Sequence, residues 1–403
     1  MSILSLPASA ERPLPTMTRG LAFLFAFCTG AIAANIYYAQ PIIRLIAPDV
    51  GLSEGAASLI VSLTQIGYAL AMLFLVPLSD LVENRRLIFF ATSLAAASLL
   101  GAALTSHPAA FLLLSLLIGI SSVAVQVLIP LAAHLAPDES RGRLVGGIMS
   151  GLLLGILLSR PLSSFVADHF GWRATFAGAS ALMLGILVLF ATAVPRYQPA
   201  HRSTYRQLLL SLEQLFRRMP VLRERAALQA TLFAVFSLFW TAVPIELSRH
   251  YDLSQSQIGL FALVGALGAV AAPLAGRLAD AGRTRGATLA ALALAASSFL
   301  PTMFGSGFGV IGLAFTGVAL DFAVQMNLVL GQRAIYGLEA ASRGRLNALY
   351  MTSIFIGGAV GSAVASEIHA LGGWLAIAAL GATLPLAALI WFAFLSPAAR
   401  RGD

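Results

Sequence analysis

The segment Ser140-Arg141-Gly142-Arg143-Leu144 recurs as Ser342-Arg343-Gly344-Arg345-Leu346, 202 residues further along the chain. Three other pairs of segments recur in the same order at nearly the same offset: Leu52-Ser53 with Leu253-Ser254, Leu78-Ser79-Asp80 with Leu278-Ala279-Asp280, and Gly171-Trp172 with Gly373-Trp374. This offset is close to half of the 403 residues. The chain therefore contains one structural unit twice, and parallel repeats of this kind place a site at their interface.

Each half is rich in long apolar runs. Hydrophobic residues make up 59% of the chain and charged residues only 10%, where soluble domains carry about 25% charged residues. A transmembrane helix needs about 20 residues. Runs of suitable length lie at 20–43, 55–78, 87–105, 109–136, 144–167, 174–194, 227–248, 256–279, 287–304, 308–336, 346–369 and 374–395. The sequence predicts an all-α membrane protein whose twelve transmembrane helices form two pseudo-symmetric six-helix bundles, which disfavours a soluble enzyme, a nucleic-acid binder or a secreted disulfide scaffold.

The distribution of basic residues predicts the orientation. All 25 basic residues are Arg. Arg44, Arg173 and Arg249 fall on one side of the membrane, Arg160 and Arg333 lie within spans, and the other twenty lie on the side of the two termini. Basic residues mark cytosolic loops, so we expect both termini in the cytosol.

The predicted spans and the polar segments between them divide the chain into five parts. These are a cytosolic extension (1–17), a six-helix bundle (18–194), a basic linker (195–225), a second six-helix bundle (226–396) and a cytosolic tail (397–403). Residues 1–16 contain no apolar stretch of the length found in a cleavable signal. In the linker, Leu208, Leu212 and Leu215 recur at helical spacing. They predict either an amphipathic helix on the cytosolic leaflet or a solvated linker.

The loop sequences resemble those of one transporter family. Gly276-Arg277-Leu278-Ala279-Asp280-Ala281-Gly282-Arg283 is similar to the cytosolic loop motif GxLaDrxGrk of the major facilitator superfamily. The copy around Asp80 keeps the acid and the basic end of the motif but lacks the leading Gly. Asn35-Ile36-Tyr37-Tyr38-Ala39-Gln40-Pro41 resembles a signature of a bacterial branch close to the twelve-span drug:proton antiporters. The resemblance covers residues 18–396 and implies a monomeric secondary transporter of the bacterial inner membrane, without a cofactor.

The same resemblance implies a cytosolic gate. In the family, each loop acid caps the start of a helix in the opposite half, where a carboxylate is stabilised by the helix N-terminus. By that pattern Asp80 faces Arg345–Asn347, and Asp280 faces Arg143–Val145. The predicted gate residues are Asp80, Arg85, Arg141, Asp280, Arg283 and Arg345. The alternative is that these are ordinary exposed acids near basic loops.

Glycines recur at four-residue spacing in two corresponding spans. Gly147, Gly151 and Gly155 lie in the fifth span, and Gly357 and Gly361 lie in the eleventh. Small residues at this spacing let two helices approach closely. Antiporters of the family carry a glycine motif in the fifth span that ends in Gly-Pro, whereas this run ends in Arg160-Pro161. The motif is therefore partial, and it leaves the direction of transport open.

Ionisable side chains within the spans are the strongest functional candidates, because they are costly in a bilayer. Asp321 lies about 20 Å into the tenth span at 1.5 Å per residue and shares a helix face with Gln325. A buried carboxyl favours its protonated form, so Asp321 either carries the coupling proton or joins two helices. Arg160 either pairs with Asp321, binds an anionic group of the substrate, or extends outward to the interface. We expect Glu246, near the outer end of the seventh span, at the interface.

Uncharged polar and aromatic residues complete the predicted substrate cavity. The full predicted wall is Asn35, Tyr38, Gln126, Arg160, Phe236, Trp240, Gln325 and Asn347. Aromatic walls suit an amphipathic ligand, although the same rings could face lipid or neighbouring helices. The sequence contains no nucleotide-binding, metalloprotease or serine-hydrolase motif, and the single Cys28 excludes an intrachain disulfide. We therefore predict no enzyme, catalytic residue or metal site. The leading hypothesis is proton-coupled export of a small amphipathic or drug-like molecule, and the alternative is proton-coupled uptake of a small organic solute.

Overall fold

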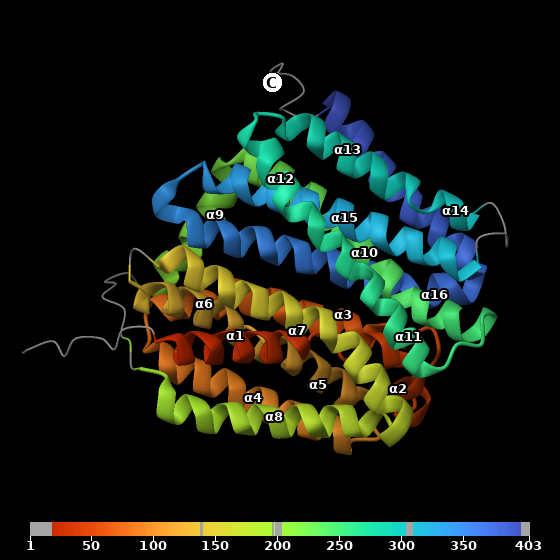
Figure 1. Ribbon diagram of the computed structural model, residues 1–403, viewed down its shortest axis with the longest axis horizontal. Helices are drawn as coiled ribbons and strands as arrows, with labels where there is room; N and C mark the ends of the chain where they lie inside the picture. The colour runs from red at the N-terminus through yellow and green to blue at the C-terminus, as the bar shows by residue number, and fades with distance from the viewer. Residues whose placement is uncertain (1–17, 138–139, 196, 198–203, 304–308, 396–403) are drawn as a thin grey trace, which may run out of the picture.

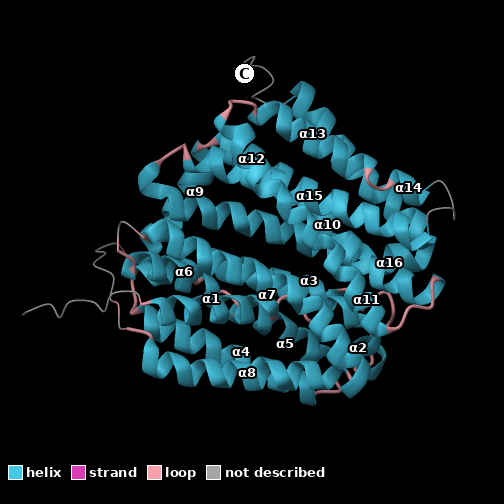
Figure 2. Cartoon of the chain, in the orientation of Figure 1, coloured by secondary structure: helices cyan, strands magenta, loops and turns pink. Residues whose placement is uncertain are grey.

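The computed structural model describes residues 18–137, 140–195, 197, 204–303 and 309–395, and these form helices with no strand among them (Figure 2). The first half contains α1 (Arg19–Ala34), η1 (Gln40–Ile42), α2 (Ile43–Asp49), α3 (Leu59–Phe74), η2 (Val76–Asp80), α4 (Asn84–Leu104), α5 (Pro108–Ser121), α6 (Ala124–Leu135), α7 (Arg141–Phe170) and α8 (Trp172–Ala193). The connecting helix is α9 (Tyr205–Arg218). The second half contains α10 (Pro220–His250), α11 (Gln255–Ala262), η3 (Leu263–Val270), α12 (Ala271–Asp280), α13 (Thr284–Ser297), α14 (Leu300–Met303), α15 (Gly309–Tyr336), η4 (Ala340–Ser342), α16 (Arg343–Ile390) and η5 (Trp391–Leu395). The predicted extension (1–17) and tail (397–403) lie outside the described residues.

The helices account for twelve passes. Ten helical segments of the described chain are long and apolar enough to cross a membrane, judged by length and composition. One of them, Arg343–Leu395, contains both of the last two predicted spans, and the shorter apolar helix Arg19–Ala34 supplies the first span. Figure 1 shows the first half, from red to yellow-green, packed along the second half, from green to blue. The predicted fold class, an all-α membrane protein of two six-helix bundles, is confirmed.

The helices run between two opposite ends of the molecule. We call the end at which α1 begins and α9 lies the terminal end, and the end at which α2 and α11 lie the distal end (left and right in Figure 1). Successive spans alternate in direction, so α10 and the first part of α16 both run from the terminal end to the distal end.

The repeated Gly-Trp pair marks equivalent turns in the two halves. Gly171, between α7 and α8, has a φ of 81°, and Gly373, which interrupts α16, has a φ of 60°. Glycine adopts this left-handed region without steric cost, whereas other residues do so rarely. A glycine at each position therefore lets one span end and the next begin within a few residues at the distal end.

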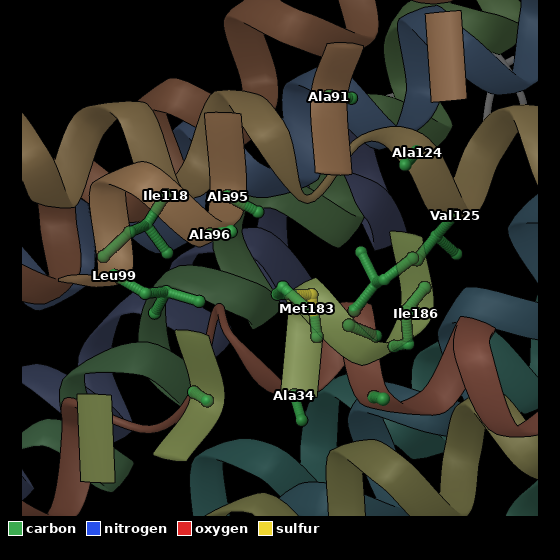
Figure 3. Close-up of a cluster of buried hydrophobic side chains, with 14 of the residues drawn as sticks. Ala34, Ala91, Ala95, Ala96, Leu99, Ile118, Ala124, Val125, Met183 and Ile186 are labelled. Atoms are coloured by element: carbon green, nitrogen blue, oxygen red, sulfur yellow. The ribbon is translucent and has the colours of Figure 1, made fainter. Parts of the chain in front are cut away.

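Each half has its own apolar core. Figure 3 shows part of the first, in which Met183 and Ile186 of α8 lie near Ala34 of α1 and Leu99 of α4. The core of the second half gathers large side chains from α10, α13, α15 and α16, with Phe239 and Phe299 among those that are fully buried. These two cores lie within their own halves, whereas smaller clusters of buried residues, such as the one with Tyr68 and Phe355, join the halves.

The predicted glycine crossings are present in both halves. A Cβ on Gly151 or Gly155 would overlap backbone atoms of α1, and a Cβ on Gly357 or Gly361 would overlap the backbone of α10. A Cβ on Gly147, by contrast, would meet nothing within 4 Å. Helix packing therefore explains four of the five glycines, as expected for small residues at four-residue spacing.

The seventh span begins earlier than predicted. Helix α10 starts at Pro220 rather than at residue 227. Arg225, assigned to the linker by its charge, is buried in this helix, where its Nη1 donates to the Thr288 hydroxyl at 2.8 Å. Its guanidinium also lies 5.4 Å from the centre of the Phe392 ring. Burial is tolerated because these contacts partner the charge.

The connecting helix α9 is amphipathic, but its apolar stripe is covered by protein. Leu208, Leu212 and Leu215 are buried, and the last two pack in one cluster with Leu222 and Leu346 of the second half. This stripe is therefore not available to a lipid leaflet, which corrects the expectation of a lipid-facing stripe. The Tyr205 hydroxyl donates to the Phe74 carbonyl of α3 at 2.9 Å, so α9 contacts both halves.

Candidate functional site

Asp321 is buried in the middle of the second half. It is 8% exposed on α15, and its Oδ1 accepts a hydrogen bond from Trp240 Nε1 of α10 at 2.9 Å. Its other side faces η3, where a Cβ on Gly265 or Gly268 would overlap the Asp321 side chain. A 3₁₀ segment within a span often marks a functional hinge. The sequence predicts one continuous helix for the eighth span, but the span changes from α-helix to 3₁₀ helix where it contacts Asp321.

Arg160 approaches the same place from the first half. It is 6% exposed on α7, and its Nε donates to Gln40 Oε1 at 2.9 Å. Its guanidinium lies 4.9 Å from the centre of the Trp240 ring and 5.1 Å from that of Tyr37, and Phe236 lies 5.6 Å away. Arg160 therefore points into the protein, and the expectation that it could extend outward to the interface is wrong. Aromatic faces stabilise a desolvated cation, which accounts for this inward position.

Trp240 lies between the acid and the cation. Its indole N–H binds Asp321, while its ring face contacts the Arg160 guanidinium. Arg160 and Asp321 also attract each other electrostatically. The cation comes from the first half and the acid from the second, so this cluster joins the two halves. The Arg160 Nη2 is buried and has no hydrogen-bond partner among the described residues.

Hydrogen bonds between the halves extend from this cluster to the distal end. Gln65 of α3 donates to the Ser237 hydroxyl at 2.8 Å, and Gln40 donates to the Thr241 hydroxyl at 3.3 Å. Nearer the distal end, the Ser256 hydroxyl donates to Asp168 at 2.5 Å. These contacts hold the distal end closed over the site.

The predicted cavity residues fall into two groups. Gln126 lies at the interface of the halves, since its side chain donates to the Tyr68 hydroxyl at 2.9 Å and the Tyr68 ring is 4.4 Å from the ring of Phe355. Phe236 lies there too, stacked on Phe233 at 5.0 Å. Gln325 is half-buried on α15, one turn from Asp321.

Three other predicted cavity residues lie elsewhere. Asn35 donates to the Met183 sulfur at 3.4 Å, and Tyr38 is buried in the core of the first half. Asn347 accepts from the Tyr336 hydroxyl at 2.9 Å near the terminal end. The sequence did not single out Tyr37 and Gln40, which contact Arg160 in place of Asn35 and Tyr38.

Four of the predicted gate residues make contacts with residues of their own halves. Arg141 donates to the Ala133 carbonyl at 2.9 Å, Arg85 donates to the Ala191 carbonyl at 2.6 Å, and Arg345 donates to the Ser342 hydroxyl at 2.8 Å. Asp280 forms an ion pair with Arg333 of α15 instead of the predicted contact with the start of α7. Asp80 is half-buried at the end of η2, and Arg283 is exposed before α13.

Glu246 is buried, contrary to the expectation of an interfacial position. It is 7% exposed and accepts hydrogen bonds from His369 of α16 and His250 of α10, each at 3.0 Å. The two histidines explain how the carboxylate is accommodated below the surface. The sequence could have indicated the contact between Glu246 and His369, because both residues lie near the distal ends of their spans. In the part of the chain that the structure describes, no group of three or more His, Cys, Asp or Glu is arranged to hold a metal ion.

Comparison with known proteins now identifies the family. The family model described as "Major Facilitator Superfamily" matches residues 22–236 and 225–403. The chain belongs to the major facilitator superfamily. It is 40% identical to the uncharacterized transporter YgaY of Escherichia coli O157:H7 over 383 residues. The match covers 94% of this chain and 97% of that protein. A chloramphenicol resistance protein of Streptomyces lividans is 25% identical, over 92% of this chain and 95% of its own length. A crystal structure of a D-xylose-proton symporter has the same fold, with a TM-score of 0.76 at 17% identity and coverage of 94% and 97%. This member of the superfamily is therefore a multi-pass membrane transporter.

Proposed function

We propose that this transporter works by alternating access and couples the export of small amphipathic, drug-like molecules to the entry of protons. Asp321 binds the coupling proton. Arg160, Gln126, Phe236, Trp240 and Gln325 form the wall of the substrate site. The protein acts as a monomer in the lipid bilayer, and the proton gradient supplies the energy.

The observation that carries this proposal is the buried cluster of Asp321, Trp240 and Arg160 between the two halves. An ionised Asp321 attracts Arg160, and charges attract strongly where water is excluded. Proton binding removes the charge of the acid and leaves Arg160 without its counter-charge. Proton binding therefore weakens the attraction between the halves. Because the proton binds the two conformations with different affinity, it shifts the equilibrium between them.

The proton assignment is tested with Asp321→Asn. Substrates are first found by growth of a pump-deficient bacterial strain on a panel of amphipathic drugs that includes chloramphenicol. The purified variant is then placed in vesicles with an imposed pH gradient. Because Asn keeps the shape but cannot bind the proton, we expect gradient-driven transport to fall at least about tenfold, while exchange of substrate across the membrane persists.

The matched control is Asp252→Asn, an exposed acid in the loop after α10. Its φ is 51°, a conformation that Asn also tolerates. We expect transport by this variant to equal that of the wild type. Gradient-driven transport at the wild-type rate by Asp321→Asn would reject the assignment.

The direction of transport rests on the aromatic wall and on the similarity to a chloramphenicol resistance protein. Proton-coupled uptake of a small organic solute is the second candidate, and the buried Arg160 favours it because this cation suits a solute with an anionic group. Inverted membrane vesicles separate the two. Substrate added outside should raise the lumenal pH if the protein is an antiporter, and it should lower that pH if the protein is a symporter.

We also place both termini in the cytosol of a bacterial inner membrane, so that the terminal end is cytosolic. The support is the excess of Arg on that side. The cytosolic gate is then formed by Asp80 and Asp280 with Arg85, Arg141, Arg283 and Arg345. In the present conformation Asp280 forms an ion pair with Arg333 of its own half, which suits a gate that is unlocked at Asp280 while the distal end is closed.

A further inference from the structure

Two buried ionisable side chains at the distal end take no part in the cluster around Asp321. Glu246 of α10 and His369 of α16 are both buried, and 3.0 Å separates Glu246 Oε2 from His369 Nε2. His250 approaches the same oxygen, but its own side chain is largely exposed. Histidine commonly changes its charge at a pH between about 5 and 8. A buried histidine bonded to a carboxylate is therefore a place where a proton can be held.

The bond to Glu246 determines which ring nitrogen of His369 can take up a proton. An ionised carboxylate only accepts hydrogen bonds, so His369 donates from Nε2, and a neutral imidazole then has a free lone pair on Nδ1. This Nδ1 has no hydrogen-bond partner among the described residues, and it is not one of the unpartnered atoms that are fully buried. A proton can therefore bind at Nδ1 while the bond to Glu246 is kept.

A cavity at the distal end gives protons a route to His369. Its volume is about 270 Å³, and its wall includes His369 and Arg249 of the second half with Arg44 and Glu54 of the first. A cavity needs roughly 15 Å³ to hold one water molecule. The side chain of Glu54 is 76% exposed, so the cavity opens to the distal side. Water can therefore carry protons to His369 while the distal end is closed.

The charged groups around His369 can accommodate this proton. Arg44 and Arg249 oppose a further positive charge, but both are attracted to Glu54, which lies 2.7 Å from Arg249. The carboxylate bonded to His369 is a different one, that of Glu246. The two arginines and the two carboxylates balance one another, and a protonated His369 meets a carboxylate directly.

The charge on His369 also acts across the two halves. His369 belongs to the second half and interacts electrostatically with Glu54 of the first. Arg44 of the first half opposes this attraction, although Glu54 counters its charge. The attraction needs a protonated imidazole, and it exists only while the halves meet at the distal end. By linkage, the closed conformation binds the proton more tightly, and the proton favours closure.

We propose that His369 and Glu246 form a second proton-binding site, which is filled from the distal cavity and whose proton favours closure of the distal end. The proton binds at Nδ1 of His369, and Glu246 fixes the ring through Nε2. This site is separate from Asp321 and does not depend on the direction of transport.

Proton binding is measured by nuclear magnetic resonance of the purified full-length protein with labelled histidine rings. The signal that is missing in His369→Gln belongs to His369. We expect this signal to move through one titration step between about pH 5 and 9, with the neutral ring carrying its proton on Nε2. Glu246→Gln should weaken proton binding at least about tenfold, because the imidazolium loses a charge-assisted hydrogen bond. The melting temperature of each variant shows whether it is folded.

Two variants should leave the titration of His369 unchanged. Glu213→Gln removes an exposed acid of α9 that pairs with Arg217. Asp321→Asn alters the proposed coupling site, so a failure of that assignment in transport leaves this result as it is. A His369 signal that does not move over this pH range would overturn the proposal, as would unchanged proton binding in Glu246→Gln or a loss of the titration in Asp321→Asn.

The link to closure is measured with spin labels on exposed residues of the two halves at the distal end. In the wild type, the population with the longer distance should be severalfold larger at about pH 9 than at about pH 6, because the imidazole loses its charge over this range. His369→Gln keeps a donor for Glu246 but takes up no proton, so the larger population should be present at both pH values. Equal populations in the wild type at the two pH values would reject the link to closure.

Discussion

At the scale of single residues, Gly265 sets how closely η3 approaches Asp321. A Cβ at this position would overlap the Asp321 carboxylate and press on the Trp240 ring. Overpacking of this kind costs about 1–3 kcal/mol. We therefore expect Gly265→Ala to displace Asp321 from Trp240 and to reduce proton-driven transport in vesicles. Gly178→Ala is the control, because a Cβ there meets nothing within 4 Å. Equal transport by the two variants would contradict this role for Gly265.

Some residues of the buried site can be recognised in the sequence, and others cannot. Asp321 and Arg160 are visible because an ionisable residue in an apolar run is conspicuous. Tyr37 and Gln40 are not, because α1 ends at Ala34 and the chain then passes through turns into η1. A rotation of 100° per residue, which favoured Asn35 and Tyr38, does not apply to such a segment. The contact of Gln40 with a residue 120 positions away also leaves no local signal.

At the scale of elements, the crossings of α1 with α7 and of α10 with α16 depend on glycine. Gly155 faces the backbone of Gly30, and Gly361 faces that of Ala234. We expect Gly155→Ala and Gly361→Ala each to destabilise the protein by about 1–3 kcal/mol, because the helices must separate. Gly147→Ala should be neutral or slightly stabilising, since Ala has the higher helix propensity. Unfolding of the purified variants in denaturant measures the difference, and equal stability of all three would reject packing as the reason for the glycines.

Span positions were predictable, whereas departures from regular helix were not. Apolar runs and turn residues mark where each element begins and ends, so the predicted spans agree with the helices to within a few residues in most cases. The early start of α10 and the rewound η3 depend on partners from other elements. Arg225 is buried because it contacts Thr288 and Phe392. The glycines of η3 pack directly against Asp321. Such partners are distant in the sequence.

At the scale of the whole molecule, the fold follows from patterns that repeat along the chain, but the conformation does not. The single recurrences of Gly-Trp and of Ser-Arg-Gly-Arg-Leu, at nearly the same offset, suffice to predict two similar halves. Which end is closed depends on a small free-energy difference between two packings of those halves. Asp280 pairs with Arg333 in the present packing, and we expect it to contact the start of α7 in the other. The motif is the same in both, so it cannot distinguish them.

We expect the ion pair between Glu54 and Arg249 to make closure of the distal end depend modestly on pH, because Glu54 is exposed and exposed ion pairs contribute little to stability. The hydrogen bond from Arg249 lowers the pKa of Glu54 below its ordinary value of 4.5. The pair therefore contributes above that value, and its contribution is lost as the pH falls through the lowered pKa. Since both side chains are partly exposed, salt should reduce the effect. We expect the distal end to stay closed from neutral pH to about pH 4.5 and to open partly in stronger acid.

Spin labels across the distal end measure this opening. Cys28 is the single cysteine, so Cys28→Ala provides the background for labels at His107→Cys and Leu371→Cys, two exposed positions on opposite halves. The label-to-label distance should lengthen in part of the population below the lowered pKa of Glu54, and Glu54→Gln should show the longer distance already at neutral pH. Glu213→Gln breaks an exposed pair with Arg217 within α9 and should leave the distance unchanged. If Glu54→Gln kept the short distance at neutral pH, closure would depend on the hydrogen bonds between the halves and not on this ion pair.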